Sequence, residues 1–148
     1  MNKEITVRKA TEKDLDEIAL IMKKEFFKAP YHENWTKESA IKTIKTYSEL
    51  GDILVAESDK KTIGFVVFRE ESYNSGSQIT IEELVILKEL QGMGIGKKLV
   101  NEVEEHAKKK NIKFIHLSTN KKAPAYGFYK HLGYIPNEQT VFLRKELK

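Results

Sequence analysis

The sequence predicts a mixed α/β fold, in which a mostly antiparallel central sheet is flanked by four helices. Three observations support this prediction. Residues 53–87 contain three strand-like apolar segments separated by short polar turns. Residues 11–27 and 36–50 instead repeat apolar side chains at helical spacing. Finally, residues 78–117 read as strand, helix and strand, which is the order of a parallel crossover.

The first third of the chain predicts one strand and two helices. Residues 5–8 alternate apolar and polar side chains, as a short strand does. A helix over residues 11–27 begins at an N-cap threonine, and Pro30 blocks its continuation. Thr36 caps the second helix. The loop between the two helices, residues 31–35, is rich in aromatic side chains.

The centre of the chain predicts three strands, over residues 53–56, 62–68 and 78–87. The third strand changes the phase of its apolar alternation at Glu82 and Glu83, and a phase change inside one strand indicates a β-bulge. Strand alternation alone would place these two carboxylates on opposite faces of the sheet, so that only one reaches a given site unless the bulge intervenes.

The last third predicts two helices and three strands. After a glycine-rich turn we expect a helix to residue 110, a strand at 114–117, a helix over 123–132 and a final extended pair at 134–136 and 141–144. Neither a linker nor an internal repeat interrupts the pattern. The sequence therefore predicts a single domain over residues 1–148.

Composition excludes several classes of function. The chain has 148 residues, 26 Lys and Arg against 22 Asp and Glu, and no Cys. The net charge of +4 is too small for a charge-dominated nucleic-acid binder. Without Cys there is no thiol nucleophile or disulfide, and the four scattered His lack metal-ligand spacing, so no metal is expected. No apolar run suits a membrane span or signal peptide, so we expect a soluble, cytoplasmic protein that binds neither nucleic acid nor membrane.

The strongest chemical signal is the glycine-rich segment between a predicted strand and a predicted helix. Glycine permits the backbone angles that turn successive N–H groups toward one point, and a helix N-terminus attracts negative charge. A phosphate or pyrophosphate is the natural ligand. A P-loop would need glycine in place of Gln91, and a dinucleotide fingerprint would need it in place of Lys97, so neither motif fits. From spacing alone, a tight turn that binds nothing remains possible. The three glycines are Gly92, Gly94 and Gly96.

Two segments carry a family resemblance. Gln91–Gly96 resembles the Arg/Gln-x-x-Gly-x-Gly/Ala signature of the GNAT superfamily of N-acetyltransferases, and Leu84-x-Ile86 is similar to its Leu-x-Val lead-in. Downstream, Ala125–Tyr134 resembles the Ala-x-x-Phe-Tyr-x-x-x-Gly-Phe pattern of that family. The order of predicted elements is also the GNAT order, so the resemblance covers essentially the whole chain and implies a GNAT-like sheet, splayed at the cofactor-binding strands.

The resemblance implies acetyl-CoA as co-substrate. Backbone amides of the glycine turn would hold the pyrophosphate, and the bulged strand would pair with the pantetheine arm, with an N–H near Ile86 polarising the thioester carbonyl. Asn120 stands out of register for a pantetheine contact, because Lys122 occupies the position where many members carry Asn. The expected cofactor-binding residues are Leu84, Val85, Ile86, Gln91, Gly92, Met93, Gly94, Ile95, Gly96, Lys97 and Asn120.

The implied reaction is direct attack of a neutral amine on the thioester. Tyr129 occupies the family's Tyr position on the last helix and is the expected acid for the thiolate, with Tyr126 in reserve. Glu82 and Glu83 are the candidate bases, and a water relay is the alternative. Each of these residues also has a plain structural interpretation: Tyr129 as a packing aromatic, the two Glu as surface carboxylates.

Aromatic residues and one carboxylate are expected to form the acceptor site. Aromatic faces beside a carboxylate attract a cationic amine, although ordinary apolar closure of a helix–helix turn is an alternative. A small amine, an aminoglycoside, a polyamine or a peptide amine would suit this site. A homodimer is possible, and a non-catalytic acetyl-CoA sensor or regulatory module on the same fold is the competing function. The acceptor candidates are Phe27, Tyr31, Glu33, Trp35 and Tyr73.

Overall fold

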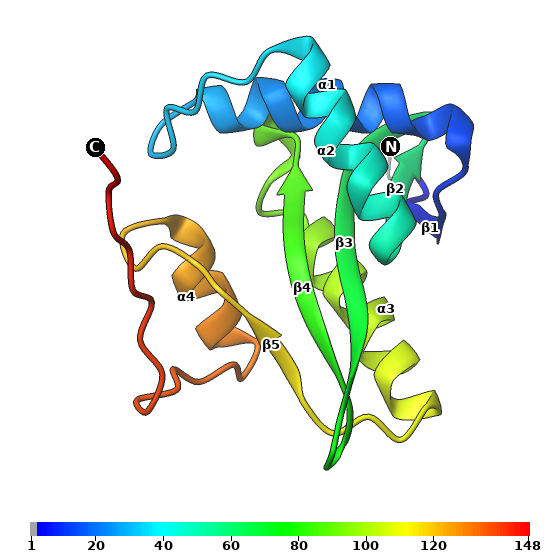
Figure 1. Ribbon diagram of the computed structural model, residues 1–148. Helices are drawn as coiled ribbons and strands as arrows, with labels where there is room; N and C mark the ends of the chain where they lie inside the picture. Colours follow the sequence, from blue (N-terminus) through cyan, green and yellow to red (C-terminus); the bar gives the residue numbers. More distant parts are fainter. Residues whose placement is uncertain (1–2) are drawn as a thin grey trace. The chain divides into compact units, whose positions relative to one another are not determined.

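The computed structural model describes residues 3–148 and contains a five-stranded mixed sheet in the order β1-β2-β3-β4-β5 (Figure 1). Strands β1 to β4 pair with one another in antiparallel fashion, and β5 runs parallel to β4. The predicted sheet is therefore confirmed. The strands are β1 (Thr6–Lys9), β2 (Asp52–Ser58), β3 (Lys61–Tyr73), β4 (Gly76–Ile86) and β5 (Ile115–Leu117).

Four α-helices accompany the sheet, as predicted. Short 3-10 turns precede the first helix, at Glu12–Asp14, and the third, at Lys88–Leu90. The chain divides into two compact units, the first ending at Ser118 and the second comprising residues 119–148, and only the last helix belongs to the second unit. The helices are α1 (Leu15–Phe27), α2 (Lys37–Leu50), α3 (Ile95–Lys109) and α4 (Pro124–His131).

The core of the first unit has two layers, one on each face of the sheet. Helices α1 and α2 cover one face, where their apolar side chains pack against Val55, Phe65 and Val67. Helix α3 lies on the opposite face (Figure 1). Because helices cover both faces, every residue of β3 from Thr62 to Phe68 is buried, as expected for a strand inside a sheet.

The predicted N-cap is confirmed for α2, whereas α1 begins four residues later than predicted: Thr11 precedes the 3-10 turn, and Asp14, the N-cap of α1, makes no side-chain cap hydrogen bond. The Thr36 hydroxyl accepts the Ser39 N–H at 3.0 Å, which confirms the predicted cap of α2 and stabilises the helix by about 1 kcal/mol. Ahead of α1, Arg8 donates to both carboxylate oxygens of Asp14 at 2.8 and 2.9 Å and also to Glu57. These bonds join β1 and β2 to the start of α1, and the guanidinium holds the pKa of Asp14 far below its usual range.

The hairpin of β3 and β4 is longer than predicted, because its pairing continues to Tyr73 and Gly76. The extended pair expected at 134–136 and 141–144 is wrong, since no strand follows β5 in the described chain. These segments alternate apolar side chains but find no sheet neighbour, and a strand is stable only when another strand takes its hydrogen bonds. Their larger apolar residues are therefore exposed, by 72–89% at Ile135, Val141, Phe142 and Leu143. Within residues 3–148, no helix combines the length and hydropathy needed to cross a membrane.

Candidate active site

A β-bulge in β4 shapes the site. Val67 lies opposite Glu83 and Phe68 opposite Ile81, so Glu82 is the extra residue, which confirms the predicted bulge. The bulge interrupts the alternation of side chains and turns both carboxylates toward α2. Glu83 accepts a hydrogen bond from α2, and Glu82 lines a cavity beside the same helix. The arrangement on opposite faces that plain alternation predicts is therefore absent here.

Glu83 is a carboxylate with a raised pKa on the face that α1 and α2 cover. It is half-buried, and its Oε1 accepts a hydrogen bond from the Tyr47 hydroxyl at 3.2 Å. Burial raises the pKa of Glu83 to about 7; the bond from Tyr47 opposes this rise, and the charges of Glu33 and Glu82 add to it. A carboxyl group with a pKa near neutrality is suited to take up and release a proton at physiological pH.

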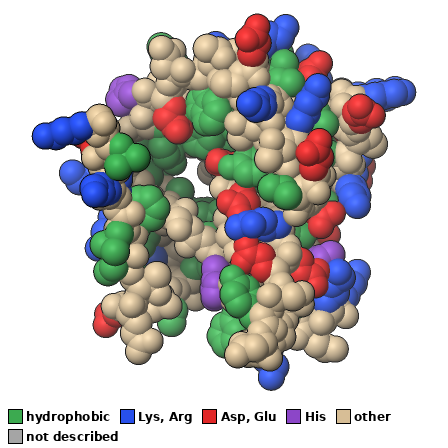
Figure 2. All heavy atoms as spheres, in the orientation of Figure 1, with side chains coloured by type: hydrophobic (Ala, Val, Ile, Leu, Met, Phe, Trp, Pro, Cys, Tyr) green, Lys and Arg blue, Asp and Glu red, His purple; other side chains and the backbone are tan. Residues whose placement is uncertain are grey.

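Glu82 has a different environment, because a cation neutralises it. Arg69 Nε donates to Glu82 Oε1 at 2.6 Å, and Arg69 Nη2 lies 2.6 Å from Glu71. Figure 2 shows acidic and basic side chains side by side over the β3–β4 hairpin. A cavity of about 220 Å³ adjoins this pair, lined by Tyr47, Leu50, Gly51, Val67, Arg69 and Glu82. The bulge therefore carries one paired carboxylate and one whose contact is a neutral hydroxyl.

The loop between α1 and α2 supplies two predicted acceptor residues near Glu83. Burial raises the pKa of Tyr31, and the charges of Glu33 and Glu83 raise it further, so these three groups lie within electrostatic reach of one another. The Tyr31 ring stands edge-on to Phe26, with centroids 5.1 Å apart. The loop thus places an aromatic ring and a second carboxylate within electrostatic reach of the Glu83 carboxyl.

The other three acceptor candidates are arranged differently. Trp35 packs against the core, and its Nε1 is buried without a hydrogen-bond partner among the residues described. Phe27 ends α1 and is 66% exposed. Tyr73 sits at the hairpin tip and donates to Glu71 at 2.6 Å. It lies six residues along β3 from Val67, about 20 Å at the usual strand rise, so the structure does not bring it to Glu83.

The glycine-rich turn leads into α3 as predicted. Gly92 and Gly94 have φ angles of +83° and +84°, which side chains rarely adopt, and a Cβ at either position would meet no atom within 4 Å. Lys98 N–H donates to Gly94 O, the first bond of the helix, so the N–H groups of residues 95–97 have no acceptor within α3. The Ile95 side chain is buried, whereas Met93 is 64% exposed. The turn therefore presents backbone donors at an open, positively polarised helix end.

The sheet opens between β4 and β5 next to this turn. Their parallel pairing covers only Ile79–Ile81 of β4, and Leu84–Ile86 pair with β3 alone among the described strands. The N–H of Leu87 bonds to Ile63 on β3, and alternate residues of a strand direct their backbone groups to opposite edges. The N–H groups of Leu84 and Ile86 thus point to the open edge, where the Ile86 carbonyl accepts Gln91 Nε2 at 3.1 Å. This confirms the predicted splay.

The second unit contains the remaining site candidates. Asn120 Oδ1 accepts the Lys122 N–H at 2.8 Å, forming a turn that leads into α4. Tyr129 is 6% exposed, and its ring lies against Phe128 and Tyr134, with centroids 5.1 and 5.4 Å apart. Tyr126 is partly exposed, with Lys130 above its ring.

Comparison with known families agrees with this geometry. The family model described as "Acetyltransferase (GNAT) family" matches residues 17–134, well over half of the chain. The chain belongs to the GNAT family. Membership makes it an N-acetyltransferase, and GNAT enzymes use acetyl-CoA.

Solved structures show the same GNAT fold over 97–99% of the chain. A possible acetyltransferase from Clostridium difficile 630 is 20% identical with a TM-score of 0.84, and covers 97% of this chain and 99% of its own. The aminoglycoside N-acetyltransferase AAC(6')-Iy in complex with CoA is 17% identical with a TM-score of 0.78, over 99% and 98% of the two chains. A transcriptional regulator from Bacillus halodurans C-125 is 25% identical with a TM-score of 0.77, over 97% and 100%. No curated protein sequence matches this chain significantly.

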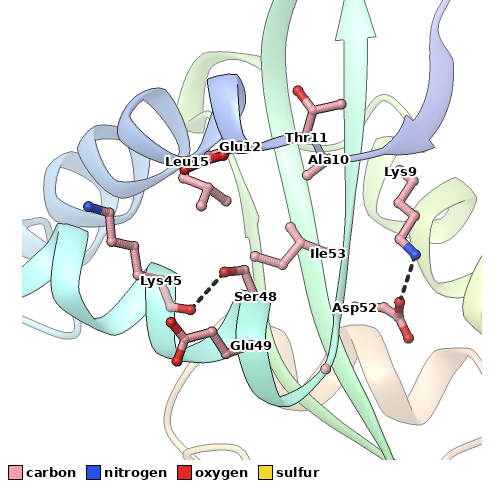
Figure 3. A pocket seen from close by; sticks show the side chains of 11 residues that line it. Lys9, Ala10, Thr11, Glu12, Leu15, Lys45, Ser48, Glu49, Asp52 and Ile53 are labelled. Atoms are coloured by element: carbon pink, nitrogen blue, oxygen red, sulfur yellow. Dashed lines mark hydrogen bonds and ion pairs between the residues drawn. The ribbon is translucent and has the colours of Figure 1, made fainter.

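The GNAT chain has a second, larger hollow that contains none of the predicted site residues. This cavity of about 500 Å³ lies at the beginning of α1, between α2 and the β1–β2 edge. Figure 3 shows that its lining is mixed in charge, with Lys9 and Asp52 paired at 3.4 Å. Its charged side chains are two lysines and three carboxylates, and none of the bulge residues lines it. We therefore assign the candidate active site to the bulge rather than to this hollow.

Tyr47 belongs to the site but was not predicted as a site residue from the sequence. Tyr47 lies on the apolar face of α2 with Ala40 and Ile44, which indicates only core packing. A buried tyrosine hydroxyl nevertheless needs a hydrogen-bond partner, so a tyrosine at the edge of an apolar helix face is itself a signal. Its partner, Glu83, lies 36 residues away in the sequence.

Proposed function

We propose that this GNAT enzyme transfers the acetyl group of acetyl-CoA to a primary amine by direct attack, with Glu83 as the general base. The main support for this proposal is the half-buried Glu83 carboxyl. Burial raises its pKa to about 7. Glu83 lies in the part of β4 beyond Ile81, which pairs with β3 but not with β5. Glu82 is the weaker candidate, because Arg69 holds it in an ion pair.

In the proposed reaction the amine nitrogen forms a bond to the acetyl carbon, and the carbon–sulfur bond breaks. The attacking nitrogen loses a proton to Glu83, directly or through one water. The departing thiolate takes a proton from Tyr129, a role carried over from the family resemblance of α4. The N–H of Ile86, which points to the open edge, would polarise the thioester carbonyl.

The residues of the turn and of β4 fit acetyl-CoA, whose thioester supplies the activated acetyl group. The free N–H groups at the start of α3 suit a pyrophosphate, and Gly92 and Gly94 leave room for its close approach. The open edge at Leu84–Ile86 suits the amide groups of the pantetheine arm. Asn120 is a further candidate contact, through its side-chain amide nitrogen. Since the family match spans both compact units, we propose that residues 1–148 act as one domain.

The acceptor we propose is a cationic amine. Glu33 lies within electrostatic reach of Glu83 and Tyr31, which gives the site negative charge beside an aromatic face. Phe27 and Trp35 would supply apolar surface around it. Polyamines and aminoglycosides fit this description better than a neutral peptide segment, and one structural neighbour is an aminoglycoside N-acetyltransferase. We further propose a cytoplasmic location and a homodimer.

The experiment is an amine panel with acetyl-CoA, monitored by release of free thiol. The chain contains no Cys, so CoA is the only source of thiol in the assay. The panel comprises a polyamine, an aminoglycoside, a lysine peptide and a free peptide N-terminus. We expect turnover with the polyamine or the aminoglycoside. Turnover only with peptides would contradict the cationic small-amine proposal.

A non-catalytic acetyl-CoA sensor is the second candidate, because one structural neighbour is a transcriptional regulator. Such a module needs the glycine turn but not the raised pKa of Glu83. Calorimetry separates the two functions. Binding of acetyl-CoA with no thiol release from any amine would support the sensor, whereas binding with turnover supports the enzyme.

A further inference from the structure

Tyr47 makes a contact with Glu83 that core packing alone does not require. Its ring packs against the core beneath α1 and α2, while its hydroxyl donates to Glu83 Oε1 at 3.2 Å. The Tyr47 hydroxyl is thus a side-chain donor to this carboxylate. The bond joins α2 to the bulged segment of β4 and thus holds one carboxylate oxygen in a defined place.

The other charged and titratable groups around Glu83 cannot replace this donor. Glu33, from the loop between α1 and α2, and Glu82, from β4, carry negative charge and repel the carboxylate. Tyr31, from the same loop, interacts with Glu83 only through charge. Arg69 on β3 is occupied by Glu82 and Glu71. The Tyr47 hydroxyl therefore stabilises the carboxylate form of Glu83, which these other groups do not.

We propose that Tyr47 is a positioning residue for Glu83: its hydroxyl holds Oε1, so that Oε2 is left to accept the proton of the attacking amine. This inference rests on the proposed function. It assigns to α2 a part in catalysis, although Tyr47 itself touches neither the amine nor the thioester.

The Tyr47 hydroxyl keeps its proton, and so remains a hydrogen-bond donor, throughout the pH range in which Glu83 ionises. Burial raises the pKa of Tyr47 well above its usual range, and the charge of Glu83 adds to the rise. By donating to the ionised carboxyl it lowers the pKa of Glu83 from the value that burial alone would impose. Removing the donor should therefore raise the pH at which Glu83 becomes a base.

The test is Tyr47→Phe, which keeps the ring and its packing. The ionisation of Glu83 is followed by carboxyl ¹³C NMR, with the resonance assigned by its loss in Glu83→Gln. We expect the titration midpoint to rise by about 0.5–1 unit, the usual worth of one hydrogen bond. The ascending limb of kcat against pH should move by the same amount, with little change in KM for the amine.

The matched control for the NMR titration is Tyr31→Phe, which removes a hydroxyl near Glu83 that makes no bond to it. In Tyr31→Phe the titration midpoint of Glu83 should equal that of the wild-type protein. An unchanged midpoint in Tyr47→Phe, with only a lower melting temperature, would overturn the positioning role and leave Tyr47 as a packing residue.

The proposed function fails separately. Wild-type turnover and an unaltered pH profile in Glu83→Gln would show that Glu83 is not the general base. If Glu83→Gln loses activity but Tyr47→Phe leaves the titration midpoint of Glu83 unchanged, Glu83 remains the base. Only the positioning role of Tyr47 is then overturned.

Discussion

Replacing Glu83 with glutamine should stabilise the protein above neutral pH. The pKa of Glu83 rises from 4.5 to about 7, mainly because of burial. Between these values the unfolded chain has lost the proton while the folded protein still keeps it, so the wild-type protein loses stability as pH rises. Above pH 7 the full penalty is present, at most about 3 kcal/mol for a shift of this size.

Glutamine has no such penalty, because it is neutral at every pH and its oxygen can still accept from Tyr47. We therefore expect Glu83→Gln to match the wild type near pH 4. At pH 8 it should be more stable by up to about 3 kcal/mol, or roughly 6–12 °C in melting temperature for a chain of this length.

The assay is denaturant unfolding of both proteins at pH 4 and pH 8. The control is Glu82→Gln, which breaks a partly exposed ion pair with Arg69 and should lower stability by no more than about 1 kcal/mol. An equal difference between wild type and Glu83→Gln at the two pH values would show that Glu83 ionises as freely in the folded protein as in the unfolded chain.

Three further substitutions test other parts of the structure. Gly94→Asp should abolish acetyl-CoA binding in calorimetry, because it places a negative side chain at the helix end; Gly76→Asp, at another open glycine with positive φ, controls for backbone strain and should bind normally. Tyr129→Phe should lower turnover by about 10²- to 10⁴-fold with unchanged acetyl-CoA affinity, and near-normal turnover would reject the acid role. Asp14→Asn should cost about 2 kcal/mol at pH 7. Because Arg8 lowers the pKa of Asp14, this cost should vanish as pH falls through the acidic range, and a constant cost in denaturation curves would contradict the ion pair.

The sequence predicted local features of the site better than its three-dimensional contacts. The phase change at Glu82 revealed the bulge, because the alternation of apolar and polar side chains depends only on neighbouring residues. It did not reveal that both carboxylates face α2, since that depends on which residue is left unpaired against β3. The contact of Tyr47 with Glu83 was missed for a similar reason: it joins a helix to a strand across 36 positions.

In the C-terminal segment the sequence predicted strands that the structure does not contain. Its apolar alternation at Val141 and Leu143 suits a strand, yet alternation describes only one chain, and a strand also needs a neighbour with free hydrogen-bonding groups. By contrast, the cap of α2 and the glycine turn were predictable. Thr36 and Gly94 act through backbone groups within four residues, which the local sequence determines.

The most direct test of Glu83 as the base is a comparison of Glu83→Gln with Glu82→Gln, using the preferred amine of the panel. The two substitutions make the same chemical change at adjacent positions of one bulge. We predict that Glu83→Gln lowers kcat/KM by about 10²- to 10⁴-fold and loses the ascending pH limb near 7, while Glu82→Gln retains both within a few-fold. A larger loss in Glu82→Gln, with Glu83→Gln close to wild type, would contradict the assignment of the base to Glu83.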